Sequence, residues 1–468
     1  MDLETTEFQY EPRMSDADAL MWSIEKDPQL RSTIVWVSIL DRTPDRERFE
    51  RVMERATRVV PRLRQRVLGH PYSIAPPRWE VDPNFDLDYH LRWMKVIGAG
   101  TEREVFDLAA PIAMQGFDRA RPLWEMTVVE GLEGDRAAII GKVHHAITDG
   151  VGGVRLQMEM LDLERQPATE KPMPPAPEPE PVTERRRIVD AMNYEAGRQA
   201  GRLRDLVHSA ATSAGKLVSD PIGVIDESLQ TAASLGRLVA PVTEPLSPLM
   251  RDRSLSVHFD TIAIPLDELK APSRVVAGRL NDAFVAGVAG GLRRYHAEHG
   301  VEVDALRMTM PINVRTEANA RTAGNAFVPA RFAVPVGIVD PLQRMDAIRK
   351  LVAHQRAEPA LALTDSVAAL LNRLPTTATT AVFGSMLKGI DFITSNVPGA
   401  PVPVYVAGAK VQAQVALAPM TGSAANVTLL SHEATCHIGI NVDPAAVTDP
   451  ALFTACLRES FVEICKVG

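Results

Sequence analysis

A proline-rich run over residues 167–181 limits the folds open to this chain more than any other feature of its sequence. Proline lacks a backbone N–H and fixes φ, so the run cannot form a helix or a central strand, and we interpret it as an extended linker. The chain has 468 residues, which is too long for one ordinary hydrophobic core. The run therefore predicts an N-terminal lobe over residues 1–165, a connector over residues 166–253 and a C-terminal lobe over residues 254–468.

Both lobes mix strand and helix patterns. In the N-terminal lobe, two apolar runs separated by a polar turn predict strands over residues 124–130 and 137–143. In the C-terminal lobe we expect strands over residues 256–264, 306–312 and 331–336, and helices over residues 281–296, 340–358 and 451–467. These patterns predict an α/β (α+β) fold with mixed or antiparallel sheets flanked by helices.

The connector carries an amphipathic helical pattern over residues 185–218. Its apolar residues fall at three- and four-residue steps. They are Leu203, Leu206, Val207, Ala210, Ala214, Leu217 and Val218, with Arg198, Arg202 and Arg204 off that face. Two interpretations stay open: a helix packed on the protein body, and a helix lying on an anionic membrane surface.

Composition excludes several classes of protein. The net charge is −8, and no basic patch interleaved with aromatic residues is present, so we expect no nucleic-acid partner. The sequence contains no run of 18 or more apolar residues, so we expect no transmembrane helix. The acidic N-terminus lacks the features of a secretory signal, so the default expectation is cytoplasmic residence. The three cysteines, Cys436, Cys456 and Cys465, form no Cys-x-x-Cys pair, and we expect buried or idle thiols in a reducing compartment.

The segment from His144 to Gly150 holds the residues most informative about chemistry. Histidine is the natural general base near neutral pH, and a hydroxyl attacking a thioester needs a base to remove its proton. The departing thiol, with an ordinary pKa of about 8.5, is a good leaving group, so no covalent enzyme intermediate is required. Asp149 can fold back to anchor the segment, and Gly150 supplies a backbone angle that other residues resist.

These histidines admit three other interpretations. An isolated histidine pair is often structural. A metal site is not expected, because adjacent histidines on a strand point in opposite directions and no third ligand lies nearby. The sequence also lacks a Gly-x-Ser-x-Gly elbow, which argues against a serine hydrolase.

Five motifs in order resemble those of the bacterial wax ester synthase/diacylglycerol acyltransferase family, within the CoA-dependent acyltransferase superfamily. They are the Asp18-to-Glu25 opening, Pro122-Leu123-Trp124, the His144–Gly150 motif, Asn281-Asp282 followed by Gly291-Leu292-Arg293, and the turn Ser395-Asn396-Val397-Pro398-Gly399. The resemblance covers nearly the whole chain. It departs at Met21 and Trp22, where Phe and Leu are more usual, and at His432, where the family carries tyrosine.

The resemblance assigns roles to individual residues. It implies that His145 is the general base, with His144 beside it in the motif. Asp149 would be structural, and Arg315 is its candidate partner, although Arg315 could equally form a surface ion pair.

The same resemblance implies residues that shape the site. Pro122, Leu123 and Trp124 would shape the acyl or alcohol channel, with a core tryptophan as the alternative. Asn281, next to Asp282, would order the site, with a helix N-cap as the alternative. Ser395 and Asn396 are further candidates, and the site would lie in a tunnel between the lobes.

The function implied by the resemblance is transfer of a fatty acyl group from acyl-CoA to a lipid alcohol, either diacylglycerol or a long-chain fatty alcohol. Acyl-CoA is then a co-substrate, and no cofactor or metal is expected. The partners would be these substrates and the surface of a membrane or lipid droplet. Two alternatives stay open: a condensation-type acyltransferase that takes its acyl group from a carrier protein, and a non-catalytic lipid-binding protein.

Overall fold

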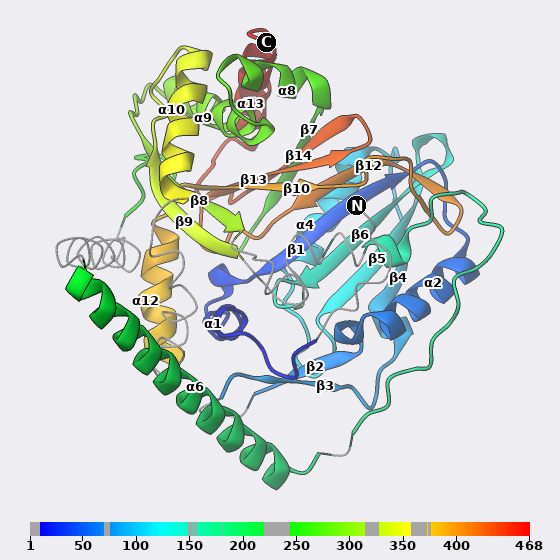
Figure 1. Cartoon of the computed structure of the whole chain (residues 1–468). Coiled ribbons are helices and arrows are strands. Elements are labelled where there is room, and N and C mark those ends of the chain that lie inside the picture. The colour runs from blue at the N-terminus through cyan, green and yellow to red at the C-terminus, as the bar shows by residue number, and fades with distance from the viewer. Residues whose placement is uncertain are drawn as a thin grey trace.

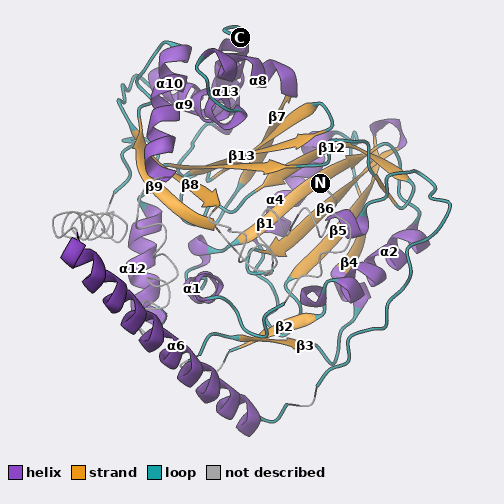
Figure 2. Ribbon diagram, viewed as in Figure 1, coloured by secondary structure: helices purple, strands orange, loops and turns teal. Residues whose placement is uncertain are grey.

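The computed structural model describes residues 10–69, 75–147, 153, 157–180, 182–219, 244–313, 327–356, 372 and 376–468. Within these residues the strands form two six-stranded sheets and one two-stranded sheet, with helices on their outer faces (Figure 1, Figure 2). Within them, no helix combines the length and apolar character that crossing a bilayer requires.

The first sheet belongs mainly to the N-terminal half. Its strand order is β11 (Tyr405–Val406), β12 (Ala409–Leu417), β1 (Thr33–Leu40), β6 (Arg136–His144), β5 (Trp124–Leu132) and β4 (Leu91–Lys95). Only the β4–β5 pair among these strands is parallel. The predicted pair of strands is therefore confirmed as β5 and β6, with Gly134 at a positive φ of 72° in the short turn η3 (Glu133–Asp135) between them.

Strand β1 contributes side chains to two hydrophobic cores, because successive side chains point to opposite faces of the sheet. Trp36 and Leu40 pack with α2 (Arg46–Val59) on one face. Val35 and Val37 pack with α4 (Glu102–Met114) on the other. A strand buried on both faces needs an almost continuous apolar run, and β1 has one.

The second sheet has the order β7 (His258–Pro265), β14 (Thr435–Val442), β13 (Ala425–His432), β10 (Phe392–Pro398), β8 (Leu306–Asn313) and β9 (Phe327–Val334). One face packs in a large core with α8 (Leu266–Val275), α9 (Leu280–Glu298), α10 (Pro341–Arg356) and α13 (Pro450–Cys465). Helices α9 and α13 approach closely because α9 carries glycines where they cross. A Cβ on Gly287 would lie 2.3 Å from the Phe461 ring, and one on Gly291 would lie 2.6 Å from Leu457.

The two sheets meet at β12. This strand pairs with β1 from Val35↔Leu417 onward, so a hairpin from the C-terminal half completes the N-terminal sheet. On its face, β12 also packs against β13 and β14. A Cβ on Gly439 of β14 would lie 2.0 Å from the Ala416 carbonyl oxygen, so only glycine fits at this crossing.

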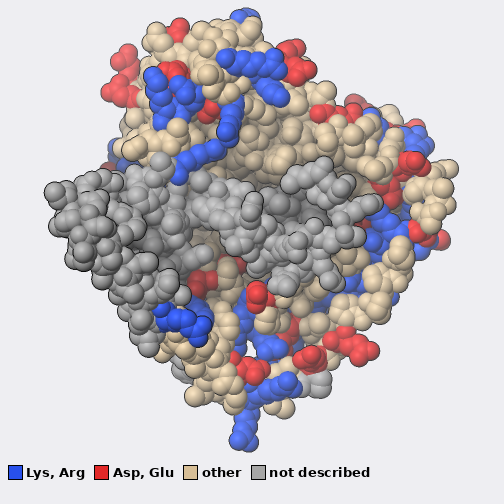
Figure 3. Space-filling model, viewed as in Figure 1, with Lys and Arg blue, Asp and Glu red and all other residues tan. Residues whose placement is uncertain are grey.

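Shorter elements complete the described chain. They are α1 (Asp16–Ile24), η1 (Pro28–Leu30), η2 (Pro61–Leu63), β2 (Gln65–Leu68), β3 (Arg78–Val81), α3 (Leu87–His90), α6 (Glu184–Ser219) and α12 (Thr376–Lys388). On the face shown in Figure 3, acidic and basic side chains are intermingled.

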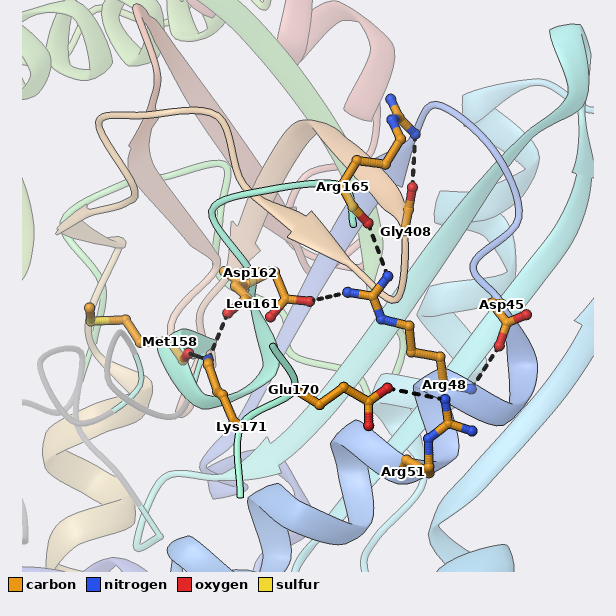
Figure 4. Close-up of polar contacts among 10 residues, drawn as sticks. All are labelled: Asp45, Arg48, Arg51, Met158, Leu161, Asp162, Arg165, Glu170, Lys171 and Gly408. Carbon is orange, nitrogen blue, oxygen red and sulfur yellow. Dashed lines mark hydrogen bonds and ion pairs between the residues drawn. The ribbon is translucent and has the colours of Figure 1, made fainter. Parts of the chain in front are cut away.

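The proline-rich residues 167–180 form neither helix nor strand, as predicted. They run beside α2, whose Arg48 and Arg51 contact the chain just before this run and at Glu170 within it (Figure 4). Arg48 pairs with Asp162 at 2.6 Å and donates to the Arg165 carbonyl at 2.9 Å. Further along the helix, Arg55 and Arg58 donate to the carbonyl oxygens of residues 172 and 174. The linker is thus tethered to the N-terminal lobe by a row of guanidinium groups.

Helix α6 confirms the predicted helix of the connector. The side chains of the apolar face proposed for its second half, from Leu203 onward, lie outside the described residues. In its first half, polar side chains face the protein body and form ion pairs: Arg187 with Glu80 at 2.8 Å, Asp190 with Arg78 at 3.1 Å, and Arg198 with Asp16 at 2.7 Å.

One local prediction is wrong. Residues Ser395 to Gly399 were expected to form a turn, but Ser395 and Asn396 lie inside strand β10, which pairs in parallel with β13. The turn was implied by the family resemblance, yet Pro398 is the last residue of the strand. It lies beyond the residues of β10 that pair with β8, so one side of its backbone is outside the ladder.

Candidate functional site

The two adjacent histidines lie where β6 ends and a tight turn begins. His144 is the last residue of β6, and the Ile147 amide donates to the His144 carbonyl at 2.9 Å to close the turn. His145 is half-buried in that turn, and its amide donates to the Ser32 carbonyl at 2.8 Å. The backbone on both sides of the His145 side chain is therefore fixed.

The ring of His144 is fully buried, and both of its nitrogens bond within the protein. Nδ1 accepts from the Ala146 amide at 3.0 Å, and Nε2 lies 2.9 Å from Glu25 Oε1. An Nδ1 that accepts from an amide leaves the proton on Nε2, so the ring is a neutral tautomer that donates to the carboxylate. These contacts suit a residue that positions the turn.

Glu25 connects this ring to the start of β1. Its Oε1 also accepts from the Ser32 amide at 2.6 Å, and Arg119 lies 3.6 Å from Oε2. Burial raises the pKa of Glu25, but His144, Ser32 and Arg119 outweigh that effect and hold it below its ordinary value. Through Ser32 and His144, one carboxylate therefore orders the amides of both His145 and Ala146.

A cavity of about 220 Å³ opens on the face of the sheet where the His144 ring lies. His144, and not His145, contributes to its wall. The ring edge meets Trp22, with centroids 5.4 Å apart, and Phe117, with centroids 6.2 Å apart. Trp22, which departs from the usual family residue, thus supports the motif directly, and the Arg119 guanidinium covers its ring at 4.0 Å.

Family comparisons agree with this architecture. The description "Wax ester synthase/diacylglycerol acyltransferase catalytic domain" matches residues 14–284, and "WS/DGAT C-terminal domain" matches residues 323–465. The chain belongs to the wax ester synthase/diacylglycerol acyltransferase family. It is therefore an acyltransferase by family, and the family predicted from the motifs is confirmed.

Relatives within this family include two proteins of Mycobacterium tuberculosis. One, named as a candidate diacylglycerol O-acyltransferase, is 40% identical over 457 residues, which cover 97% of this chain and 92% of the relative. Another, the candidate diacylglycerol O-acyltransferase tgs1, is 25% identical over 432 residues, which cover 91% of this chain and 89% of the relative.

Solved structures share the two-lobed fold, which confirms the predicted fold class. The wax ester synthase/diacylglycerol acyltransferase of Marinobacter aquaeolei VT8 superposes with a TM-score of 0.62 at 20% identity, covering 97% of this chain and 98% of that one. The first condensation domain of the calcium-dependent antibiotic synthetase superposes equally well, with a TM-score of 0.62 at 16% identity, covering 97% and 95%. At these identities the likeness concerns the fold alone.

The Pro-Leu-Trp element of this family member anchors the core beside the motif. The Leu123 carbonyl accepts from the His144 amide at 2.9 Å, directly after Pro122. Trp124 is 2% exposed, donates from Nε1 to the Leu63 carbonyl at 2.8 Å and stacks on His90, with centroids 4.5 Å apart. These contacts match the core-tryptophan alternative for Trp124 and tie the element to the strand that carries His144.

The candidate residues of the C-terminal lobe are spread over two elements. Asn281 lies in the first turn of α9, where its Nδ2 is 3.7 Å from Met310 Sδ. It is not the N-cap, because the helix starts one residue earlier and the Asp282 carboxylate accepts from the Arg279 amide at 2.7 Å. Ser395 is half-buried and Asn396 is exposed on β10.

Three predicted site residues, Asp149, Gly150 and Arg315, lie outside the described residues, so their roles stay predictions. His432, the family departure, is buried, with Nε2 3.2 Å from the Val411 carbonyl of β12. Among the described residues, no group of three His, Cys, Asp or Glu side chains is arranged to hold a metal ion.

Sequence reasoning missed the partners of the histidine motif. In the sequence, Glu25 is only the last residue of the opening motif, and Ser32 belongs to none of the five motifs. No spacing rule joins position 25 to position 144. The available signal was that two family motifs, far apart in the chain, each contain an ionisable residue able to pair with the other.

Proposed function

We propose that the protein transfers a fatty acyl group from acyl-CoA to the hydroxyl of a lipid alcohol, diacylglycerol or a long-chain fatty alcohol, with His145 as general base. Membership of the family and the names of its relatives support this acceptor class. One structural observation supports the assignment of the base. Both nitrogens of His144 bond within the protein, so proton transfer falls to His145.

The chemistry follows from these roles. As His145 takes the hydroxyl proton, the alcohol oxygen bonds to the thioester carbonyl carbon. The carbon–sulfur bond of the resulting tetrahedral intermediate then breaks, and the CoA thiolate leaves and recovers the proton from the imidazolium. Backbone or side-chain donors would stabilise the oxyanion. The hydrogen-bonded amides on either side of the His145 side chain fix the backbone that carries its ring, which suits a proton carrier.

The test is the His145→Ala variant, assayed with palmitoyl-CoA and diacylglycerol. General-base assistance is typically worth about 10²- to 10⁴-fold, so we expect at least that loss of transfer with an unchanged thermal unfolding midpoint. His354→Ala, at an exposed position on α10, is the matched control and should keep full activity. Near-normal transfer by the His145 variant would show that the base lies elsewhere.

A condensation-type reaction is the second candidate, because the fold is shared with a condensation domain and does not distinguish the two reactions. That reaction would need a carrier protein to deliver the acyl group. Transfer from acyl-CoA alone, with no carrier protein present, supports the first proposal. Release of CoA, followed with a thiol reagent, separates both reactions from simple lipid binding.

We also propose that the protein works on the surface of a membrane or lipid droplet, through the first half of α6. The inward face of this segment is polar and ion-paired to the body. Its outward face is apolar: Ile188 is 50%, Val189 46% and Met192 61% exposed. A helix that turns its polar side inward and its apolar side outward is suited to lying in a lipid interface. The exposed Arg185 and Arg186 beside these residues add attraction to anionic lipid.

A further inference from the structure

The cavity beside His144 has a strongly cationic wall. Its charged lining residues are Lys26, Arg31, Arg119 and Glu25, and the aromatic rings of Trp22 and Phe117 complete much of the remaining wall. Three of the four charges are positive. The one carboxylate, Glu25, already accepts hydrogen bonds from Ser32 and His144.

The three cations keep most of their donors available to a ligand. Lys26 is exposed and forms no ion pair among the described residues. Arg31 donates from one terminal nitrogen to the neutral Met114 carbonyl at 2.6 Å. Arg119 lies flat on Trp22 and reaches Glu25 only at 3.6 Å, with its side chain 47% exposed. The local positive charge is therefore not cancelled within the described part of the chain.

A fourth cationic side chain, Lys142, packs against Phe117 of the cavity wall. Lys142 lies two residues before His144 on the same face of β6, fully buried, with its ammonium 4.4 Å from the centre of the Phe117 ring. It lies 3.7 Å from Glu125, a carboxylate that also pairs with Arg92, and has no hydrogen-bond partner among the described residues. Burying such a cation is costly, and an anion in the adjoining cavity would offset part of that cost.

We propose that this cavity binds a phosphate group. Guanidinium groups bind phosphate oxygens with paired N–H donors, and two of them, with an ammonium group, suit a dianion better than a single carboxylate. A volume of about 220 Å³ leaves room for one or two phosphate groups and not for a nucleoside as well. Two ligands could supply the group: the phosphates of the acyl-CoA donor, an assignment that rests on the proposed function, or a free phosphate.

The first experiment measures binding without catalysis. Inorganic pyrophosphate and CoA are titrated into the full-length protein by calorimetry, with the Lys26→Gln/Arg119→Gln double variant for comparison. Both positions are exposed, so the fold should survive, and circular dichroism verifies this. We expect pyrophosphate to bind at least tenfold more weakly to the variant. The variant loses two charged donors, and hydrogen bonds between charged groups are stronger than those between neutral groups. Arg458→Gln, at an exposed position on α13, should bind like the wild type.

The second experiment identifies the source of the phosphate. KM is measured for palmitoyl-CoA and for palmitoyl-pantetheine, which lacks every phosphate. If the cavity holds the phosphates of CoA, the double variant raises KM for palmitoyl-CoA about tenfold and leaves KM for palmitoyl-pantetheine unchanged. If neither KM changes while pyrophosphate binding is weakened, the site takes a free phosphate.

The outcomes distinguish a failure of the phosphate site from a failure of the proposed acyltransferase function. Equal pyrophosphate binding by the wild type and the double variant, or no binding by either, overturns the phosphate site. Pyrophosphate binding by a wild-type protein that transfers no acyl group from any donor leaves the site in place and removes the proposed function.

Discussion

At the scale of single residues, Glu25 has a larger role than its distance from the histidines in the chain suggests. It accepts from the Ser32 amide and the His144 ring, and these two in turn hold the amides of His145 and Ala146. A side chain that is not itself the proposed base therefore fixes the backbone that carries it. Glu25 is best described as a positioning residue.

Replacing Glu25 tests this role. Glu25→Ala leaves the buried His144 Nε2–H without its acceptor, which should cost about 1–3 kcal/mol of unfolding free energy. We expect kcat to fall at least tenfold, because the turn holding His145 loosens. KM for palmitoyl-pantetheine, which has no phosphate to enter the cavity lined by Glu25, should stay within about twofold.

Glu25→Gln is the matched variant, since its amide oxygen can still accept from the His144 ring and the Ser32 amide. It should recover most of the lost kcat. Equal loss in both variants would show that the carboxylate charge, and not the hydrogen-bond geometry, is what matters. Unchanged kcat in Glu25→Ala would contradict the positioning role.

The sequence could identify the histidine motif but not its support. Adjacent histidines, an aspartate and a glycine are local and visible in one stretch. The Glu25–His144 bond joins residues from two elements that only the folded sheet brings together. For the same reason, the cationic wall of Lys26, Arg31 and Arg119 has no signature in the printed sequence.

At the scale of elements, local patterns predicted three strands and three helices of the C-terminal half, and they did not resolve the strands β11 to β14. Strands β7, β8 and β9 and helices α9, α10 and α13 lie within a few residues of their predicted positions. The residues around Ser395 were taken as a turn because of the family motif, although they lie in strand β10. Pairing with β13 on one side decides the outcome, and that contact is not local.

Helix α6 supports a prediction about lipid binding. Val189→Glu places a charge on the outward apolar face, and we expect about tenfold weaker binding to vesicles of phosphatidylcholine and phosphatidylglycerol, because burying one aliphatic side chain is worth about 1.5–3 kcal/mol. Co-sedimentation with the vesicles measures the change.

The matched control for this helix is Val462→Glu on α13. Val462 is 48% exposed and Val189 is 46% exposed, so the two substitutions differ in location and not in accessibility. Equal loss of vesicle binding in both variants would argue against α6 as the lipid-facing element.

At the scale of the whole molecule, the junction of the two sheets carries a buried titratable group. His437 of β14 is 7% exposed and lies opposite Leu430 of β13 and Ala263 of β7. Burial lowers the pKa of His437 to about 4, with His432 acting in the same direction and Glu102 opposing it. The unfolded chain therefore binds a proton at a higher pH than the folded protein does.

This difference between the folded and unfolded pKa of His437 predicts a lower free energy of unfolding in mild acid. With a folded pKa of about 4 and an ordinary value of 6.5, the unfolded chain holds more protons between these limits. The free energy of unfolding should therefore have its full value above pH 6.5. It should fall as the pH drops towards 4, by up to about 3 kcal/mol. Denaturant unfolding at several pH values measures this change in the free energy of unfolding.

His437→Leu removes the titrating group, so its unfolding free energy should change less over the same pH window. His354→Leu, at an exposed position on α10, should follow the wild-type curve. Parallel curves for the wild type and His437→Leu would show that another group governs acid stability.

The β11–β12 hairpin has a consequence for how the chain is made. During synthesis, β1 emerges long before its partner β12, which spans Ala409–Leu417. Until then, β1 presents the unpaired backbone groups of an apolar strand, the kind of edge that recruits other chains. The nascent protein must keep that edge covered until β12 has been translated. A fragment ending at the proline run would therefore be left without its closing strand.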